Sequence, residues 1–162
     1  MEEILYRPIG VIRSPFQDTR NMPIQPAGAR GVAGTVEVEP TYADGLRDLE
    51  GFSHIILIYH FHRASGYALE VRPFLDDTPR GLFATRAPRR PNPVGLSVVR
   101  LVRVEGCILH IEDVDVVDGT PLLDIKPYVP EFDVREGERI GWLTDRVTRA
   151  HRARADDRFR SS

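Results

Sequence analysis

The sequence contains few of the residues that form cross-links and metal sites. Cys107 is the single cysteine among 162 residues. This excludes an internal disulfide and any zinc site with several cysteine ligands, and it fits a reducing cytoplasm. No run of about 18 apolar residues occurs, so the sequence predicts no transmembrane helix. The first residues, MEEILYRP, are charged where a secretory signal would be apolar, and we therefore expect a cytoplasmic protein.

Lysine is also nearly absent, and the charges are unevenly placed. Lys126 is the one lysine among 22 basic residues. Residues 80–103 contain six arginines and no acid, whereas residues 112–124 contain five acids and no base. A block of one sign usually marks a solvated face or a partner surface. Two adjoining blocks of opposite sign need a further explanation.

Short apolar and alternating segments predict an all-β fold. The expected strands cover residues 4–13, 32–39, 53–62, 81–86, 95–104, 107–117 and 121–126. Successive strands are not joined by βαβ crossovers, so we expect a closed, mainly antiparallel β-barrel. One short helix is expected over residues 41–51 and a C-terminal helix from about Thr144 to Arg154. Residues 1–140 would form the barrel domain and residues 141–162 a basic C-terminal helix or tail.

The segment PRRPNPVGLS, residues 88–97, is unusually rigid for a surface turn. Arg90 and Asn92 each precede a proline, and such residues are driven into extended backbone conformations. One interpretation is a stiff corner between two strands. The other is that the corner presents polar groups to an anion, because guanidinium groups bind carboxylates and phosphates in a bidentate way. The residues in question are Arg86, Arg89, Arg90 and Asn92.

The acidic segment EDVDVVDGTPLLDIKPY, residues 112–128, follows the arginine-rich block. Its acids could face water on a hairpin. They could instead accept hydrogen bonds from ribose hydroxyls, favour a nearby cation or act as a general base. The acids in question are Asp113, Asp115, Asp118 and Asp124.

The histidines do not form a convincing metal site. His60 and His62 share one face of the strand expected over residues 53–62, but His54 lies about 20 Å further along it. We therefore expect no metal. The basic tail is either a solvated helix end or a contact for RNA.

Four segments resemble the TrmO family, also called YaeB-like: IGVIRSPF (9–16), DLEGFSHIILIYHFH (48–62), GLFATRAPRRPNPVGLS (81–97) and VDGTPLLDIKPYVP (117–130). Members of this family are S-adenosylmethionine-dependent methyltransferases that methylate threonylcarbamoyl-adenosine beside the anticodon of tRNA. The resemblance implies a β-barrel that acts as a homodimer, with the cofactor bound near a subunit interface. The proline corner would then form one wall of the cofactor and substrate pocket.

The family's site residues can be carried over by position. Cofactor contacts would fall on Pro26, Ala27, Gly28, His62, Arg63, Arg86, Leu96, Glu112, Asp113, Val114 and Asp115. Asn92, Asp118, Lys126 and Tyr128 lie in the family motifs and are expected to orient the substrate, with Asp118 as the preferred proton acceptor. Arg89 and Arg90 are expected to contact the substrate.

Two alternatives remain open on the sequence alone. The same barrel could methylate a small molecule, or it could bind nucleotide or RNA without catalysis. Several bacterial members carry a further C-terminal domain, whereas this sequence ends near the barrel. The resemblance therefore supports the cofactor more directly than tRNA as the methyl acceptor.

Overall fold

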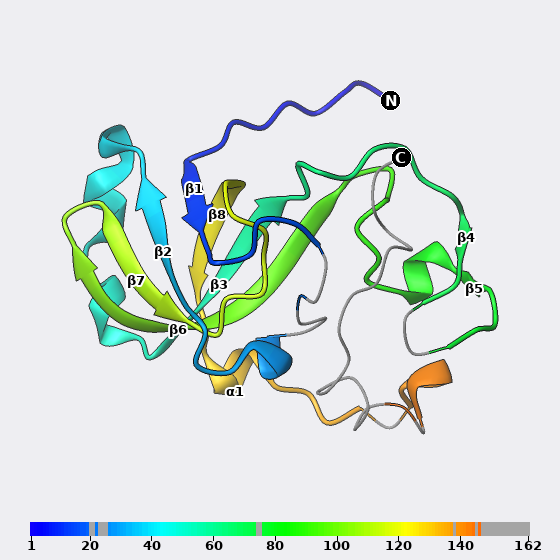
Figure 1. Cartoon of the computed structure of the whole chain (residues 1–162). Coiled ribbons are helices and arrows are strands. Elements are labelled where there is room, and N and C mark those ends of the chain that lie inside the picture. The colour runs from blue at the N-terminus through cyan, green and yellow to red at the C-terminus, as the bar shows by residue number, and fades with distance from the viewer. Residues whose placement is uncertain (20–21, 23–25, 74–75, 138, 145, 147–162) are drawn as a thin grey trace.

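Six strands close into an antiparallel barrel in the computed structural model, which describes residues 1–19, 22, 26–73, 76–137, 139–144 and 146 (Figure 1). The order around the barrel is β1-β2-β7-β6-β3-β8. The strands are β1 Gly10–Arg13, β2 Ala33–Val38, β3 His54–His60, β6 Val94–Glu105, β7 Ile108–Glu112 and β8 Thr120–Pro127. Every barrel strand has a partner on both sides, as closure requires. The predicted all-β barrel is confirmed.

Alternating side chains explain how these strands face the interior. Along β3, Ile55, Leu57 and Tyr59 are buried, and the residues between them are partly exposed. The first eight residues of β6 alternate in the same way, which places Gly95 and Ser97 inside the barrel. Because side chains in a strand point to opposite faces in turn, this pattern fixes the register of both strands.

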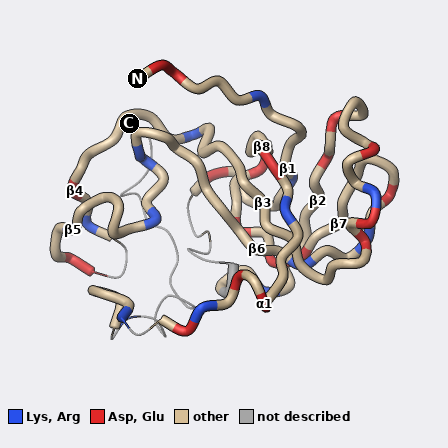
Figure 2. The backbone as a smooth tube through the Cα atoms, turned by 180° about the vertical axis from the view of Figure 1, so that it is seen from behind, with Lys and Arg blue, Asp and Glu red and all other residues tan. Residues whose placement is uncertain are grey.

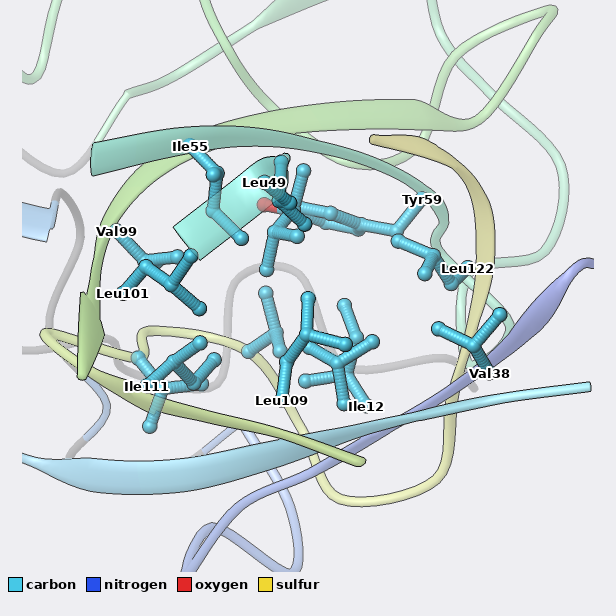
Figure 3. Close-up of a cluster of buried hydrophobic side chains, with 14 residues drawn as sticks. Ile12, Val38, Leu49, Ile55, Tyr59, Val99, Leu101, Leu109, Ile111 and Leu122 are labelled. Carbon is cyan, nitrogen blue, oxygen red and sulfur yellow. The ribbon is translucent and has the colours of Figure 1, made fainter. Parts of the chain in front are cut away.

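The core fills the barrel with aliphatic side chains (Figure 3). Ile12, Ile55, Leu109 and Leu122 have no exposed surface. Each fully buried side chain of this size stabilises the fold by about 1.5–3 kcal/mol relative to exposure. The cluster of buried residues around them contains one side chain with a hydroxyl group, Tyr59.

A tight turn joins β6 to β7, as the sequence predicts. Gly106 has a φ of 58°, in the left-handed region that glycine adopts readily. At the other end of β6, Gly95 lies against two aromatic rings. A Cβ atom at Gly95 would stand 2.4 Å from Tyr59 Cε2 and 2.6 Å from Phe61 Cζ. Only glycine therefore lets these rings pack on the backbone of β6.

A small lobe lies beside the barrel, and here one prediction is wrong. β4 (Glu70–Val71) pairs with β5 (Arg80–Gly81), and a 3-10 helix, η4 (Leu82–Ala84), follows at once. The strand predicted over residues 81–86 therefore stops at its first residue. Leu82 is buried while Phe83 is exposed. So short an apolar run fits one helical turn as well as a strand.

The helical segments also differ from the prediction. The single helix predicted over residues 41–51 is two 3-10 helices, η2 (Pro40–Leu46) and η3 (Leu49–Gly51). Asp48 separates them with a φ of 68°, which no continuous helix allows. The one α-helix described, α1 (Pro130–Asp133), was not predicted.

The C-terminal part is described only as far as residue 146. It contains a 3-10 helix, η5 (Gly141–Leu143). The helix predicted from about Thr144 to Arg154 falls almost wholly outside the described residues.

The registers place six strand ends at one end of the barrel. Arg13 pairs with Thr35, Ala33 with Glu112 and His60 with Val94. Thus β1, β3 and β7 stop where β2, β6 and β8 begin, and we call this the β7 end. Separately, no helix in the described ranges has the length and apolar character needed to span a membrane.

Candidate functional site

The β7 end gathers segments that are far apart in sequence. These are η1 (Pro26–Ala29) with the following loop, the turn after β3, the segment after η4, the proline corner before β6, and residues 113–119 between β7 and β8. Most of the expected cofactor residues lie on these segments. The structure thus brings together residues that the family resemblance assigns to one site.

Asp113 connects the acidic segment to the loop after η1. Its Oδ1 accepts a hydrogen bond of 2.7 Å from the Gly31 backbone N–H. The next backbone N–H, of Val114, donates to Val32 O at 3.2 Å. Asp113 has a φ of 71°, in the left-handed region where aspartate is one of the few enriched residues other than glycine. This turn lets Val114 enter the core, where it is fully buried, and aims Asp115 at β6.

Asp115 belongs to a chain of hydrogen bonds that runs into the barrel. Ser97 Oγ donates to Asp115 Oδ1 at 2.7 Å, and Tyr59 Oη lies 2.9 Å from Ser97 Oγ. Burial raises the pKa of Asp115 to about 6, although hydrogen bonds from Ser97 and from its own backbone N–H oppose the rise. Burial, with the nearby Asp115 charge, also raises the pKa of Tyr59. Asp115 is therefore the carboxyl group in this segment whose proton affinity is shifted toward neutral pH.

The side chain of Asp118 makes contacts that stabilise the fold. Its Oδ1 accepts a hydrogen bond of 3.0 Å from the Ser14 N–H, and its Oδ2 lies 3.9 Å from Arg13 Nη1. Ser14 Oγ in turn donates to Val116 O at 2.5 Å. These contacts fasten the end of β1 to residues 116–119. Both carboxylate oxygens of the predicted proton acceptor thus have partners within the fold.

The proline corner is held by its own arginines. Arg90 Nη1 donates to Thr85 O at 3.0 Å and to Ala87 O at 2.9 Å, and the guanidinium lies 5.9 Å from the ring centre of Phe83. Arg89 Nε donates to Ser65 O at 2.9 Å. Both predicted substrate residues therefore fix loop backbones. Asn92 is exposed at the tip of the corner.

Three expected cofactor residues with cationic or titratable side chains surround this region. His62 and Arg63 follow β3 and are exposed, and Arg86 follows η4. Desolvation lowers the pKa of His62, as do the charges of Arg63 and His60, while Asp118 opposes them. The Arg86 guanidinium acts on Tyr59 from across the same end. The effect of Asp118 on His62 indicates that the turn after β3 lies near the acidic segment, and the effect of Arg86 on Tyr59 indicates that the segment after η4 lies near the end of β3.

The remaining expected cofactor residues lie on η1, β6 and β7. Pro26, Ala27 and Gly28 belong to η1, which contacts β6, and Glu112 ends β7. Leu96 is 57% exposed and points outward from β6, away from Ser97. Its neighbour across the strands is Ile58.

Lys126 and Tyr128 lie at the opposite end of the barrel. Lys126 Nζ pairs with Asp124 Oδ2 at 2.9 Å, and the Tyr128 ring meets the edge of His54, at the start of β3. From Thr120 to Lys126 the strand rises about 20 Å. Within one chain these two residues are therefore not brought together with Asn92 and Asp118.

Two residues of the site were missed by the sequence reasoning. Tyr59 and Ser97 are both buried, with 4% and 1% exposure. The signal for Ser97 was present: it is the one polar residue at the inward positions of β6 from Gly95 to Leu101. The hydroxyl of Tyr59 gave no comparable signal, because tyrosine is common in strands.

The charged groups at the β7 end suit S-adenosylmethionine. An arginine matches its carboxylate, and carboxylates match its ribose hydroxyls and sulfonium; the β7 end supplies Arg86, Glu112, Asp113 and Asp115. In the described residues, no three His, Cys, Asp or Glu side chains form a group that could hold a metal ion.

Comparisons with known proteins agree on one family. Residues 11–134 match the family described as the tRNA-methyltransferase O N-terminal domain. The chain is also 61% identical over 156 residues to a probable S-adenosyl-L-methionine-binding protein of Pyrococcus abyssi, covering 96% of this chain and 85% of that protein. The chain belongs to the TrmO family. The prediction of the family from its motifs is therefore confirmed.

Two further relatives extend the comparison to a named enzyme and to a solved structure. The tRNA (adenine(37)-N6)-methyltransferase of Escherichia coli is 39% identical over 140 residues, covering 80% of this chain and 60% of that protein. The crystal structure of TrmO from Pseudomonas aeruginosa superposes with a TM-score of 0.73 at 40% identity, covering 87% of this chain and 63% of that one. This chain thus spans less than two thirds of either protein. The predicted cofactor and enzyme class agree with the names of these TrmO-family relatives.

Proposed function

We propose that this protein transfers the methyl group of S-adenosylmethionine to the exocyclic nitrogen of threonylcarbamoyl-adenosine, beside the anticodon of tRNA. The observation that carries the proposal is that each of the four family motifs contributes residues to the β7 end of the barrel. The E. coli relative, whose name specifies N6 of adenine 37 in tRNA, matches 80% of this chain. We retain a cytoplasmic location as part of the proposal.

The charges at the β7 end support binding of both reactants. The cofactor supplies an activated methyl group on a positively charged sulfur, and the acids of residues 112–115 provide negative charge for it. Arginines on the neighbouring lobe lie where RNA phosphates could approach (Figure 2). Methyl transfer is an in-line displacement, so holding the acceptor nitrogen behind the methyl group supplies much of the catalysis. Asn92 and the remaining N–H groups of Arg89 and Arg90 are our candidates for holding the substrate.

Arg86 is the proposed partner of the cofactor's carboxylate. We expect Arg86→Ala to weaken S-adenosylmethionine binding by on the order of 1.5–3 kcal/mol, the usual value of a charge-assisted hydrogen bond. Calorimetric titration of the folded variant measures this, with Arg103→Ala, at the far end of β6, as the control. An affinity equal to that of the wild type would remove Arg86 from the site.

We also propose that the protein is a homodimer through the outer face of β3 and β6. Ile56 pairs with Val98 and Ile58 with Leu96 across these strands, and all four point out of the barrel. An apolar stripe on a sheet face that carries an expected cofactor residue suits a second copy near the site. Light scattering should show a dimer for the wild type and a monomer for Leu96→Arg. The exposed Val102→Arg, further along β6, is the matched control and should leave the dimer intact.

A transfer assay tests the proposed function itself. The protein is incubated with labelled S-adenosylmethionine and total tRNA, prepared with and without prior threonylcarbamoylation. Incorporation that depends on the threonylcarbamoyl group supports the proposal. Cofactor binding without transfer to either tRNA would contradict it and favour a binding barrel or a small-molecule acceptor.

A further inference from the structure

A directional chain of hydrogen bonds leads from the barrel interior to the site. The single hydroxyl proton of Ser97 is donated to Asp115 Oδ1. Ser97 Oγ can then only accept from Tyr59, so the Tyr59 hydroxyl donates to it. The order Tyr59–Ser97–Asp115 therefore has one direction when Asp115 is ionised. The chain crosses from β3 through β6 to the segment after β7 and holds one carboxylate oxygen in place.

The two hydroxyl groups are fixed by the packing around them. Ser97 is 1% exposed, and the Tyr59 ring lies against Gly95 and edge-on to Phe61, with ring centres 5.5 Å apart. Figure 3 shows the Tyr59 side chain pointing into the aliphatic cluster. Buried polar groups in an apolar core are costly unless they are all satisfied. A barrel that needed only packing would place aliphatic residues at both positions.

We propose that Asp115 accepts the proton released by the acceptor nitrogen, with Ser97 and Tyr59 as positioning residues for its carboxylate. This inference rests on the proposed function. As the nitrogen forms its bond to the methyl carbon, the carbon–sulfur bond breaks and its electron pair neutralises the sulfonium. The nitrogen then loses its proton to Asp115, which becomes a neutral carboxylic acid. No oxidant, reductant or further reactant is needed.

The comparison with Asp118 favours Asp115 for this role. Asp118 uses both oxygens to hold β1. Asp115 Oδ1 accepts the hydrogen bond from Ser97, and the chain of hydroxyl groups reaches this oxygen from inside the barrel. Its raised pKa supports the same assignment, since an efficient general base titrates near the working pH.

Several charged groups could influence the titration of Asp115. Tyr59 on β3 and Arg86 after η4 are electrostatically coupled to each other, and β6 contributes the neutral Ser97 hydroxyl. The acids on the same segment are Glu112, Asp113 and Asp118. The hydrogen bond from Ser97 lowers the pKa of Asp115, so removing that hydroxyl should move the titration to higher pH.

Single-turnover methyl transfer at saturating S-adenosylmethionine, followed between about pH 5 and pH 8, tests the proposal. We expect the wild-type rate to rise with pH, to reach half of its plateau near pH 6 and to level off about one pH unit higher. At saturating S-adenosylmethionine, Asp115→Asn should lower the plateau rate by about 10²–10⁴-fold, the usual contribution of a general base. Ser97→Ala should shift the inflection to higher pH, and Tyr59→Phe should shift it less in the same direction.

Thr120→Val is the matched control. It removes another buried hydroxyl at the β7 end, which donates to the Val117 carbonyl and is not part of the Tyr59–Ser97–Asp115 chain. The inflection of the pH profile should not move in this variant. An Asp115→Asn variant with weakened cofactor binding but a wild-type rate at saturation would overturn the proposal and make Asp115 a ribose ligand. An unmoved inflection in Ser97→Ala would overturn the positioning role. If the wild type transferred no methyl group to tRNA, the proposed function would fail instead.

Discussion

Gly95 shows how a single residue sets the geometry of this site. The aromatic rings of Tyr59 and Phe61 occupy the space that any Cβ atom at Gly95 would need. The Tyr59 ring carries the hydroxyl that starts the chain to Asp115. A change at Gly95 is therefore transmitted to the site through the position of one ring.

We expect Gly95→Ala to lower the free energy of unfolding by about 1–3 kcal/mol, because overpacking forces the rings or the strand to move. Gly45→Ala is the control: no heavy atom lies within 4 Å of a Cβ built there. Denaturant unfolding of the two variants measures the difference. Equal stability of both would mean that the rings adjust freely.

The raised pKa of Asp115 also has a consequence for stability. Its folded pKa is about 6, against an ordinary value of 3.8, so the folded state binds this proton more tightly than the unfolded state. The contribution is fully present below about pH 4 and is lost as the pH rises through about 6. Above that range, ionised Asp115 costs the fold on the order of 1–3 kcal/mol.

Asp115→Asn removes this titration. We expect the variant to gain stability relative to the wild type as the pH rises from about 4 to about 7. Denaturant unfolding at several pH values gives the difference between the two proteins. A difference that stays constant with pH would show that Asp115 ionises in the folded state as it does in water.

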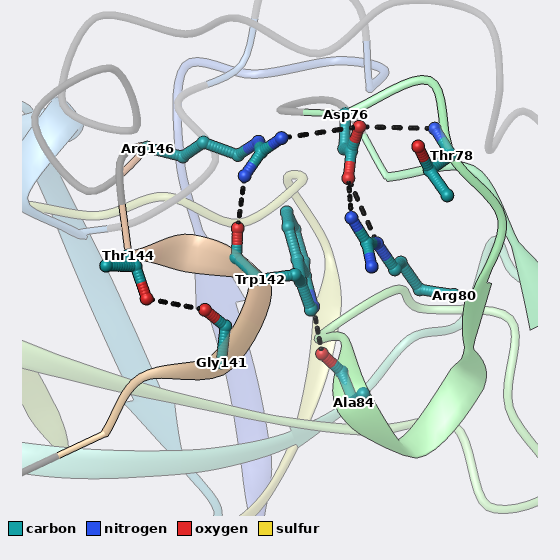
Figure 4. Close-up of polar contacts among 8 residues, drawn as sticks. All are labelled: Asp76, Thr78, Arg80, Ala84, Gly141, Trp142, Thr144 and Arg146. Carbon is teal, nitrogen blue, oxygen red and sulfur yellow. Dashed lines mark hydrogen bonds and ion pairs between the residues drawn. The ribbon is translucent and has the colours of Figure 1, made fainter.

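At the scale of elements, contacts from η5 hold the lobe that carries the arginines in place (Figure 4). Trp142 Nε1 donates to Ala84 O at 2.8 Å, and Arg146 Nη1 donates to Trp142 O at 2.6 Å. The Arg80 guanidinium lies 5.7 Å from the Trp142 ring centre and pairs with Asp76, which Arg146 also approaches at 3.7 Å. These contacts join the C-terminal segment to the stretch that leads into Arg86 and the proline corner.

Trp142→Ala should loosen this lobe and leave the barrel intact. We expect faster hydrogen exchange over residues 76–90 and an almost unchanged melting temperature, because the barrel core does not depend on η5. Trp142→Phe keeps an aromatic ring and removes the N–H donor, so it should give a smaller effect. Exchange that is unchanged in the alanine variant would show that η5 does not order the lobe.

The pH dependence of the same cluster follows from Asp76. The hydrogen bond from Arg80, with one from the Thr78 backbone, lowers the pKa of Asp76 to about 2. The contacts are therefore fully present above the ordinary value of 3.8 and are lost as the pH falls toward 2. Near neutral pH the contacts of Asp76 should therefore not depend on pH.

The elements that could be predicted are those in which one face is buried. β3, β6 and β8 follow from alternation or apolar runs, and the turn at Gly106 follows from its chemistry. The lobe could not be predicted because residues 81–86 are too short a run to separate one helical turn from a strand. The structural role of Asp118 could not be predicted from the sequence, because its partner Ser14 is 104 residues away in the chain.

At the scale of the whole molecule, we propose that the barrel serves as a frame for two functional surfaces. One is the β7 end, where acids and arginines from five segments meet. The other is the apolar outer face of β3 and β6, which bears Leu96 beside that end. Each of the four motifs that identified the family contributes residues to the β7 end. What each residue does within the site could be inferred only from the hydrogen bonds of the folded chain.

Nucleoside analysis by mass spectrometry tests the central claim most directly. Threonylcarbamoylated tRNA is incubated with the protein and S-adenosylmethionine, digested to nucleosides and compared with a reaction that contains Asp115→Asn. We expect one added methyl group on threonylcarbamoyl-adenosine with the wild-type protein and almost none with the variant. A methyl group on any other nucleoside, or equal product with both proteins, would contradict it.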